Sequence, residues 1–105
     1  MITAVVQFPL AEGTTLAEAQ AIFESTAPRY LGLAGLIRKN YLFDPETCVG
    51  GGCYTFENRA AAEALYNDAW RALIREKYGA DPEVRFFETP VMVDNVSNEI
   101  ITETP

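Results

Sequence analysis

The order in which strand-like and helix-like segments follow one another is the feature that most constrains the fold of this chain. Short runs of β-branched and aromatic residues, which are typical of strands, occupy residues 2–8, 36–43, 48–56 and 84–93. Apolar residues at three- and four-residue spacing indicate helices over residues 16–30 and 59–77. The resulting β-α-β-β-α-β order is typical of ferredoxin-like α+β folds. Because crossover connections are right-handed, we expect a four-stranded antiparallel sheet with both helices on one face.

Local signals mark the ends of these elements. Thr15 and Glu18 have the spacing of a capping box, which starts the first helix. Pro28 predicts a kink or an end in that helix, because its ring removes a backbone N–H group. Residues 44–47, Asp-Pro-Glu-Thr, predict a turn between the second and third strands. Pro90 predicts a bulge in the fourth strand or an edge position for it.

Length and surface pattern predict one domain that associates with a second copy of itself. A chain of 105 residues can bury one core. We expect residues 1–95 to form the ferredoxin-like domain. Residues 96–105 are expected to be a C-terminal tail, either frayed or an arm that packs on another subunit. The first and fourth strands carry apolar side chains on both faces, as Val5 and Phe87 illustrate. We therefore expect a homodimer in which two sheets pack face to face.

Charge and hydropathy limit the partners that this chain can have. A net charge of -7 at pH 7 argues against a nucleic-acid partner, because phosphate binding requires clustered lysine and arginine. No apolar run approaches the roughly 18 residues of a membrane-spanning helix. The N-terminus lacks the pattern of a signal peptide. We therefore expect a cytoplasmic protein with no membrane partner.

The sequence contains no histidine, which removes the commonest general base and metal ligand. This absence disfavours zinc sites, Ser–His and Cys–His nucleophile systems, and His-ligated haem. Cys48 and Cys53 lie on one extended segment, from which their side chains leave on opposite faces, too far apart for a disulfide. We interpret them as buried, reduced thiols and expect no metal site.

The most distinctive segment, residues 35–56, is a predicted hairpin that carries cationic and phenolic side chains. Alternation places Lys39 and Tyr41 on one face, where an ammonium and a phenol can together bind a phenolate, enolate or carboxylate oxygen. In the alternative interpretation, Lys39 pairs with a surface carboxylate and Tyr41 is a half-buried packing residue. Arg38 takes their place if the predicted register is wrong by one residue. Tyr54 lies on the paired strand.

Two further features bear on a pocket. Gly50, Gly51 and Gly52 weaken a strand interior, which indicates either a bulge or backbone contact between subunits, or room for a ligand ring or a neighbouring aromatic side chain. Their spacing is not that of a phosphate-binding loop. Tyr66 and Trp70 lie one helical turn apart, a spacing typical of core residues. In the alternative interpretation, these two rings form the roof of a pocket.

Five segments carry a resemblance to a known family: GLIRKNYLFD, GGGCYTF, RAAAEALY, WRALIREKYG and PVMVDN. They resemble the YdhR-type monooxygenases of the dimeric α+β barrel superfamily, which also contains the antibiotic-biosynthesis monooxygenases. The resemblance covers residues 2–95. Its most specific parts are the Lys39-x-Tyr41 strand, the glycine-rich strand that ends in Tyr54, and residues 70–79.

The resemblance implies a homodimer with a pocket between the sheet and the helices of each subunit. It also implies a monooxygenase that acts on a small aromatic or polyketide-like molecule without metal, flavin or other cofactor. The substrate's own carbanion reduces oxygen while polar groups hold its phenolate. On this basis the candidate catalytic residues are Lys39, Tyr41 and Tyr54. The candidate substrate-binding residues are Arg38, Phe56, Tyr66, Trp70, Phe86, Gly51 and Gly52.

Two other classes of function are compatible with the sequence. The first is a non-catalytic module that binds a hydrophobic metabolite or acts in a stress response. Such a module predicts a rise in melting temperature with ligand and no chemical change in that ligand. The second is an isomerase or cyclase on the same scaffold, since one fold hosts many chemistries. Turnover under nitrogen distinguishes an isomerase from an oxygenase.

Overall fold

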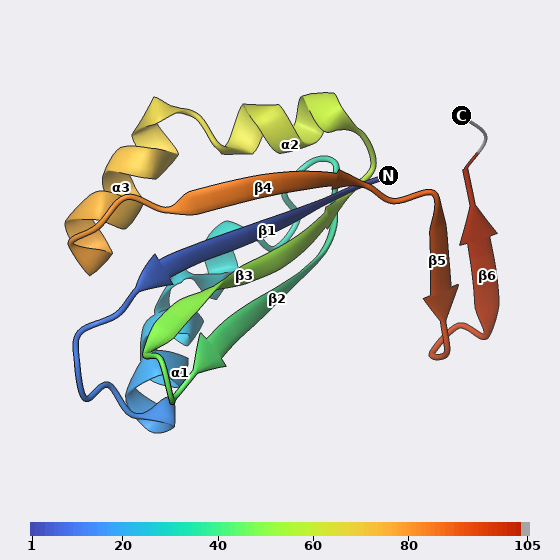
Figure 1. Ribbon diagram of the computed structural model, residues 1–105. Coiled ribbons are helices and arrows are strands. Elements are labelled where there is room, and N and C mark those ends of the chain that lie inside the picture. Colours follow the sequence, from blue (N-terminus) through green and yellow to red (C-terminus); the bar gives the residue numbers. More distant parts are fainter. Residues whose placement is uncertain (104–105) are drawn as a thin grey trace.

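The computed structural model of this chain describes residues 1–103. Its elements, in chain order, are β1 (Ile2–Pro9), α1 (Leu16–Thr26), the short 3-10 helix η1 (Ala27–Arg29), β2 (Leu36–Asp44), β3 (Val49–Phe56), α2 (Arg59–Leu65), α3 (Asp68–Tyr78), β4 (Glu83–Glu88), β5 (Val91–Asp94) and β6 (Glu99–Thr102). Figure 1 shows how they are arranged in space.

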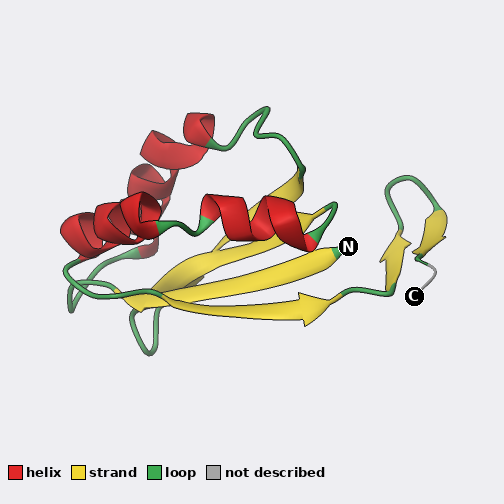
Figure 2. Cartoon of the chain, turned by 90° about the horizontal axis from the view of Figure 1, so that it is seen from above, coloured by secondary structure: helices red, strands yellow, loops and turns green. Residues whose placement is uncertain are grey.

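Four strands form one antiparallel sheet in the order β2-β3-β1-β4. The strand order is typical of a ferredoxin-like fold, because each central strand is followed by a helical crossover to an edge strand: β1 through α1 to β2, and β3 through α2 and α3 to β4. Figure 2 shows that the helices cover one face of this sheet and leave the other uncovered. The predicted fold class, α+β with a four-stranded antiparallel sheet and helices on one face, is confirmed.

The core lies between the sheet and the helices. β1 supplies one row of it, because Ile2, Ala4, Val6 and Phe8 alternate with more exposed residues and are all buried. The helices supply the opposing layer, which includes Phe23, Trp70 and Ile74. The residues of β1 that alternate with this row lie on the outer face of the sheet, which carries both polar and apolar side chains.

A bulge in β2 changes which side chains share a face. Simple alternation predicts Leu36 on the same face as Arg38, but the register shifts between these two residues. Leu36 pairs with Phe56 and packs against the core, whereas Arg38 pairs with Thr55 and points to the outer face. The predicted face of Leu36 is therefore wrong, because the bulge inserts Ile37 as an extra residue. Lys39 lies beyond the bulge and keeps its predicted face.

The second predicted helix is divided in two. α2 ends at Leu65, and Tyr66 leaves helical geometry with a ψ angle of 48°. Asn67 then starts α3, since its side-chain oxygen accepts a hydrogen bond from the Trp70 N–H group at 2.9 Å. The prediction of one continuous helix over residues 59–77 is wrong for this reason. In the first helix, by contrast, Pro28 ends the α-helical geometry as predicted, within η1.

The predicted fourth strand is also divided. β4 ends at Glu88, and β5 pairs with β6 in a separate two-stranded sheet that extends beyond the end of the main sheet (Figure 1). The prediction of one strand over residues 84–93 is therefore wrong. Pro90 cannot donate a ladder hydrogen bond, and the chain leaves the sheet there. The turn of the new hairpin spans the expected domain boundary at residue 95.

Candidate functional site

Three tyrosine rings surround the side-chain amine of Lys39. Its Nζ atom lies 3.5 Å from the ring centre of Tyr30, 3.7 Å from that of Tyr41 and 4.6 Å from that of Tyr54. Tyr30 follows η1, Tyr41 lies two residues beyond Lys39 on β2, and Tyr54 lies opposite Lys39 on β3. We call these four residues the tyrosine cage.

The electrostatics of the cage favour an uncharged lysine. Burial lowers the pKa of Lys39 from 10.5 to about 7, and within the described residues no carboxylate offsets that effect. The negative faces of the rings attract the ammonium and oppose part of the desolvation cost. Burial raises the pKa of Tyr54 and, more weakly, that of Tyr41, so both phenols are neutral at physiological pH. Near pH 7 the cage therefore holds an amine that can gain or lose a proton.

Hydrogen bonds fix the positions of two of these rings. The Tyr41 hydroxyl lies 2.7 Å from the Thr26 hydroxyl at the end of α1. The Trp70 indole N–H donates to the Tyr30 hydroxyl at 3.1 Å. The cage is thus connected to both α1 and α3, and the rings have little freedom to leave the lysine.

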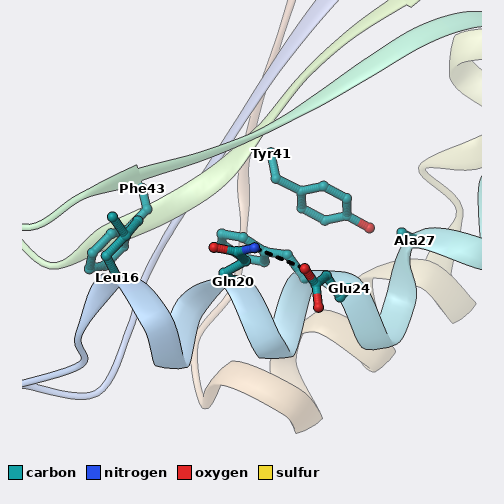
Figure 3. A pocket seen from close by; sticks show the side chains of 7 residues that line it. Leu16, Gln20, Glu24, Ala27, Tyr41 and Phe43 are labelled. Carbon is teal, nitrogen blue, oxygen red and sulfur yellow. Dashed lines mark hydrogen bonds between the residues drawn. The ribbon is translucent and has the colours of Figure 1, made fainter.

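Two hollows flank Tyr41 along the edge strand β2. The first has a volume of about 440 Å³ and lies between β2 and α1, with Leu16, Phe23 and Phe43 among its lining residues. In Figure 3 the Tyr41 ring lies between Phe43 and Ala27, with its hydroxyl on the side of Ala27. The second hollow has a volume of about 290 Å³, and both Tyr41 and Lys39 line it. These volumes suit a ligand of one to three rings.

The interior between the sheet and the helices is almost full. The space there that Lys39, Tyr54 and Tyr78 line has a volume of only about 20 Å³, enough for about one water molecule. The larger hollows lie outside this interior: two along β2, and one of about 500 Å³ that Tyr30, Leu65 and Trp70 help to line.

Four aromatic residues expected to bind substrate pack in or beside the core. Phe56, Tyr66 and Trp70 are buried, and Phe86 is half-buried with its ring centre 5.7 Å from that of Tyr66. Trp70 reaches the cage through its hydrogen bond to Tyr30. Phe56 contacts the cage through Tyr54, with ring centres 5.9 Å apart, whereas Phe86 lies beyond Tyr66.

The chain's own atoms fill the space beside the three glycines. A Cβ atom on Gly51 would lie 1.8 Å from the backbone oxygen of Val6, so the strands approach too closely there for any side chain. A Cβ atom on Gly52 would lie 2.8 Å from the Tyr54 ring and 3.3 Å from Lys39 Cε. At Gly52 the structure favours room for a neighbouring aromatic side chain, whereas at Gly51 it shows close approach of the β1 backbone. Gly52 in particular is what allows the tyrosine cage to close.

Arg38 is the candidate that the structure does not bring into the cage. It points to the outer face of the sheet, where its guanidinium lies 3.7 Å from the Asp94 carboxylate of β5. Parts of Arg38 also line the rim of the 290 Å³ hollow. Its position suits an anionic group at the entrance of that hollow better than an oxygen bound to Lys39.

The cysteines differ from their predicted setting. Both are free and half-buried, and Cys48 lies in the turn before β3 with a φ angle of 56°. The Cys48 thiol donates a hydrogen bond to the Ala11 carbonyl. The two side chains form no disulfide, as the spacing predicts.

Sequence reasoning missed Tyr30 and Thr26 as members of the site. Tyr30 is the last residue of the predicted first helix, and it continues the apolar spacing of that helix. This spacing does not distinguish a ring in the core from a ring over a cation. Only the pairing of β2 with β3 and the return of the chain after η1 bring Tyr30 to Lys39. The signal that could have found it was the presence of Pro28, which ends the helix just before Tyr30.

Several solved structures share this fold at low sequence identity. The monooxygenase from the gene ActVA-Orf6 of Streptomyces coelicolor, solved with nanaomycin D, is 17% identical over 84% of this chain and 86% of its own, with a TM-score of 0.63. SnoaB, a cofactor-independent oxygenase from Streptomyces nogalater, is 18% identical over 84% and 91%, with a TM-score of 0.59. An antibiotic biosynthesis monooxygenase is 11% identical over 85% and 98%, with a TM-score of 0.63.

These similarities establish that the chain has the ferredoxin-like fold of the antibiotic biosynthesis monooxygenases. No protein-family model matches the sequence. No curated protein matches it either. Within residues 1–103, none of the helices has the length and apolar character needed to span a bilayer. In the same part of the chain, no three His, Cys, Asp or Glu side chains are grouped so that they could hold a metal ion.

Proposed function

We propose that this protein is a cofactor-independent monooxygenase that oxidises a small aromatic or polyketide-like phenol at the edge of β2. The observation that carries this proposal is the amine of Lys39, which lies within the tyrosine cage without a carboxylate partner among residues 1–103. The shared fold with proteins named as monooxygenases and a cofactor-independent oxygenase supports it.

The first step is removal of a proton from the bound phenol or its enol. The neutral amine of Lys39 accepts this proton, and the ring faces of the tyrosine cage stabilise the ammonium that forms. The ammonium then pairs with the substrate oxyanion, which keeps negative charge next to the ring carbon that reacts. A lysine whose pKa is about 7 can accept the proton at physiological pH and can then remain charged beside the oxyanion.

The substrate carbanion then reduces molecular oxygen. When a ring methylene is converted to a carbonyl, one oxygen atom remains in the product as the carbonyl oxygen. The other oxygen atom leaves as water with the two hydrogens of the methylene. Electrons come from the substrate alone, so the residues of the chain bind, orient and exchange a proton.

Tyr41 and Tyr54 have different parts in this scheme. Tyr41 lines both hollows, and its hydroxyl can donate to a second oxygen of the substrate or hold the ring against Thr26. Burial raises the pKa of Tyr54, which excludes it as a base at neutral pH. We therefore assign Tyr54 to the wall of the cage and proton transfer to Lys39.

Oxygen uptake with hydroxyanthrone-like phenols tests this function. We expect turnover by the wild type and a loss of at least about 100-fold in Lys39→Met, the usual scale for removing a general base. Tyr41→Phe should lose about tenfold, which corresponds to one hydrogen bond. Lys77→Met is the matched control, because Lys77 is exposed and outside the cage. Equal rates in Lys39→Met and wild type contradict the proposal.

A non-catalytic binding module is the second candidate, and the 440 Å³ hollow favours it. Tyr41 lines that hollow but Lys39 does not, so a ligand bound there has no base beside it. Ligand that raises the melting temperature and is recovered unchanged, in air and under nitrogen, supports this candidate. Product formation that continues under nitrogen instead indicates an isomerase or cyclase.

We also propose that the protein is a homodimer through the outer faces of its sheets. Val5, Arg85 and Phe87 line a shallow hollow of about 130 Å³ on that face, and the Phe87 side chain is 42% exposed. A second copy placed there would bury apolar surface that the helices of one chain do not cover. The interfaces of homodimers are commonly more apolar than the rest of the protein surface.

A further inference from the structure

The 290 Å³ hollow beside the tyrosine cage has an apolar wall and a single amine. Leu36 and Ile37 of β2 lie on one side of it, and Leu31, which is 89% exposed, lies on the loop at the other. Tyr41 also lines the hollow, although Phe23 stacks on its ring and the Lys39 amine lies over that ring, and Lys39 is the only lysine that lines the hollow. A flat ring can therefore lie against the apolar side chains of Leu36 and Ile37, beside the edge of the Tyr41 ring, with its polar substituent directed at the amine.

Lys39 lies where this hollow meets the small interior space, because it lines both. Its Nζ atom is held by ring faces and not by an ion pair within residues 1–103. A nitrogen lone pair is available for bond formation only when the amine is neutral and not bound to an anion. The Lys39 amine has no anion bound to it within residues 1–103, and its lowered pKa means that a fraction of it is neutral near pH 7.

We propose that Lys39 forms a Schiff base with small planar aromatic aldehydes that enter the hollow beside Tyr41. This activity goes beyond the proposed oxygenation, since Lys39 acts as a nucleophile and no oxygen is consumed. It depends on the same cage but not on any oxidation of the ligand.

The chemistry balances without a cofactor. The Lys39 nitrogen attacks the carbonyl carbon, a C–N bond forms, and the carbonyl oxygen takes a proton to give a carbinolamine. Loss of the second N–H proton and of the hydroxyl group as water gives the imine. The open hollow admits the solvent water that carries these protons. Hydrolysis reverses the reaction, so the wild type holds the aldehyde reversibly.

The shape of the hollow predicts which aldehydes react fastest. Its volume of about 290 Å³ accommodates one to three fused rings. The ring gains apolar contact with Ile37 and Leu36 and an edge contact with Tyr41. Formaldehyde, which gains none of these contacts, reports the intrinsic reactivity of each amine in the chain.

Reductive trapping under nitrogen tests the proposal in the wild-type protein. The probes are naphthaldehyde and formaldehyde at pH 7, with cyanoborohydride as the hydride donor that converts the imine to a stable secondary amine. The chain has two lysines, Lys39 and Lys77, and peptide mapping separates them from the Met1 amine. We expect naphthaldehyde to label Lys39 at least about tenfold faster than Lys77, which is exposed and does not line the hollow.

Comparison of the two probes shows whether the aldehyde binds in the hollow before it reacts with Lys39. A Lys39-to-Lys77 labelling ratio that is higher with naphthaldehyde than with formaldehyde supports binding in the hollow before reaction. Equal ratios, or faster labelling of Lys77, overturn the proposal. Ala27→Leu adds bulk where the two hollows meet and should slow labelling by naphthaldehyde only. These results do not depend on oxygen uptake, so failure of the oxygenase function and failure of this proposal are distinguishable.

Discussion

At Lys39, two opposing effects act on one ammonium group. Removal from water disfavours the charged form, and the facing tyrosine rings favour it by about 0.5–2 kcal/mol in total. The lowered pKa means that desolvation is the larger effect. The chain therefore carries a buried basic group at a cost in stability, which is common at sites where a proton must move.

Replacing Lys39 by Met should therefore stabilise the protein near pH 6. Below pH 7 the amine is protonated in both the folded and the unfolded state, so the whole desolvation cost is present. Between pH 7 and 10.5 the folded amine loses its proton while the unfolded amine keeps it, and wild-type stability rises. We expect Lys39→Met to gain about 1–2 kcal/mol at pH 6 and less at pH 9.

Urea unfolding at pH 6, 7.5 and 9 measures this effect. Lys77→Met serves as the control for removal of a lysine, because Lys77 is exposed. The tyrosines that face Lys39 with raised pKa values, Tyr41 and Tyr54, stay neutral over the range and add no slope. A stability difference for Lys39→Met that is constant with pH contradicts the account.

At Gly51 the limit is backbone contact. Gly51→Ala would place a methyl group 1.8 Å from the Val6 oxygen, so β1 and β3 must separate. We expect a loss of about 3 kcal/mol in the free energy of unfolding. Gly13→Ala is the control, because its Cβ would meet nothing within 4 Å and only its φ angle of 85° opposes the change. An equal or smaller loss at Gly51 than at Gly13, measured by thermal unfolding, argues against close strand contact.

The end of a helix or strand could be predicted from the sequence where a local signal coincided with a change of periodicity. The capping box at Thr15 lies where predicted. The bulge at Ile37 was not predictable, because it depends on which residue of β3 lies opposite it. The break at Asn67 was hidden, because the surrounding residues keep helical spacing and favour helix on both sides.

Strand alternation and strand pairing predict one part of the site. Lys39 and Tyr41 lie on one strand, and Tyr54 lies on its hairpin partner, so alternation and pairing bring them together. Tyr30 comes from a segment after a helix, and its approach to Lys39 is set by tertiary packing. Periodicity gives no information about that kind of contact.

The cap at Asn67 gives a prediction at the level of elements. Asn67→Ala removes the acceptor for the Trp70 N–H group and should cost about 1 kcal/mol of stability. Because Trp70 holds Tyr30, we also expect weaker ordering of the cage, seen as faster amide exchange at Tyr30. Asn58→Ala, which removes the cap of α2, is the matched control and should lower stability without affecting Tyr30. Unchanged stability in Asn67→Ala contradicts the assignment of this cap.

For the whole molecule, the uncovered outer face and the hairpin of β5 and β6 are the features that one chain does not explain. The hairpin contacts the body through Arg38 and Asp94 and through the Met1 amine and Glu103. Its side chains include Val93 and Ile100, which are 66% and 72% exposed. We propose that it is an arm that packs on the second subunit of the homodimer.

Phe87→Asp tests the dimer. A carboxylate at this position, on the outer face of the edge strand β4, would be buried against the second copy without a partner, so we expect a shift to monomer at micromolar concentration. Light scattering after size-exclusion chromatography measures the mass. Leu31→Asp, at an exposed apolar position away from the sheet face, should leave the mass unchanged. A wild-type protein that is already monomeric, or a Phe87→Asp protein that stays dimeric, contradicts this interface.

Proton transfer and imine formation both require that the Lys39 amine can lose its proton near pH 7, and NMR titration of the lysine side chains measures this directly. With two lysines in the chain, selective labelling gives two Cε signals, and Lys77→Arg assigns them. We predict that the Lys39 signal titrates with a midpoint near pH 7. A Lys39 midpoint near the ordinary lysine value of about 10.4 would contradict the cage as a site of proton transfer and of imine formation.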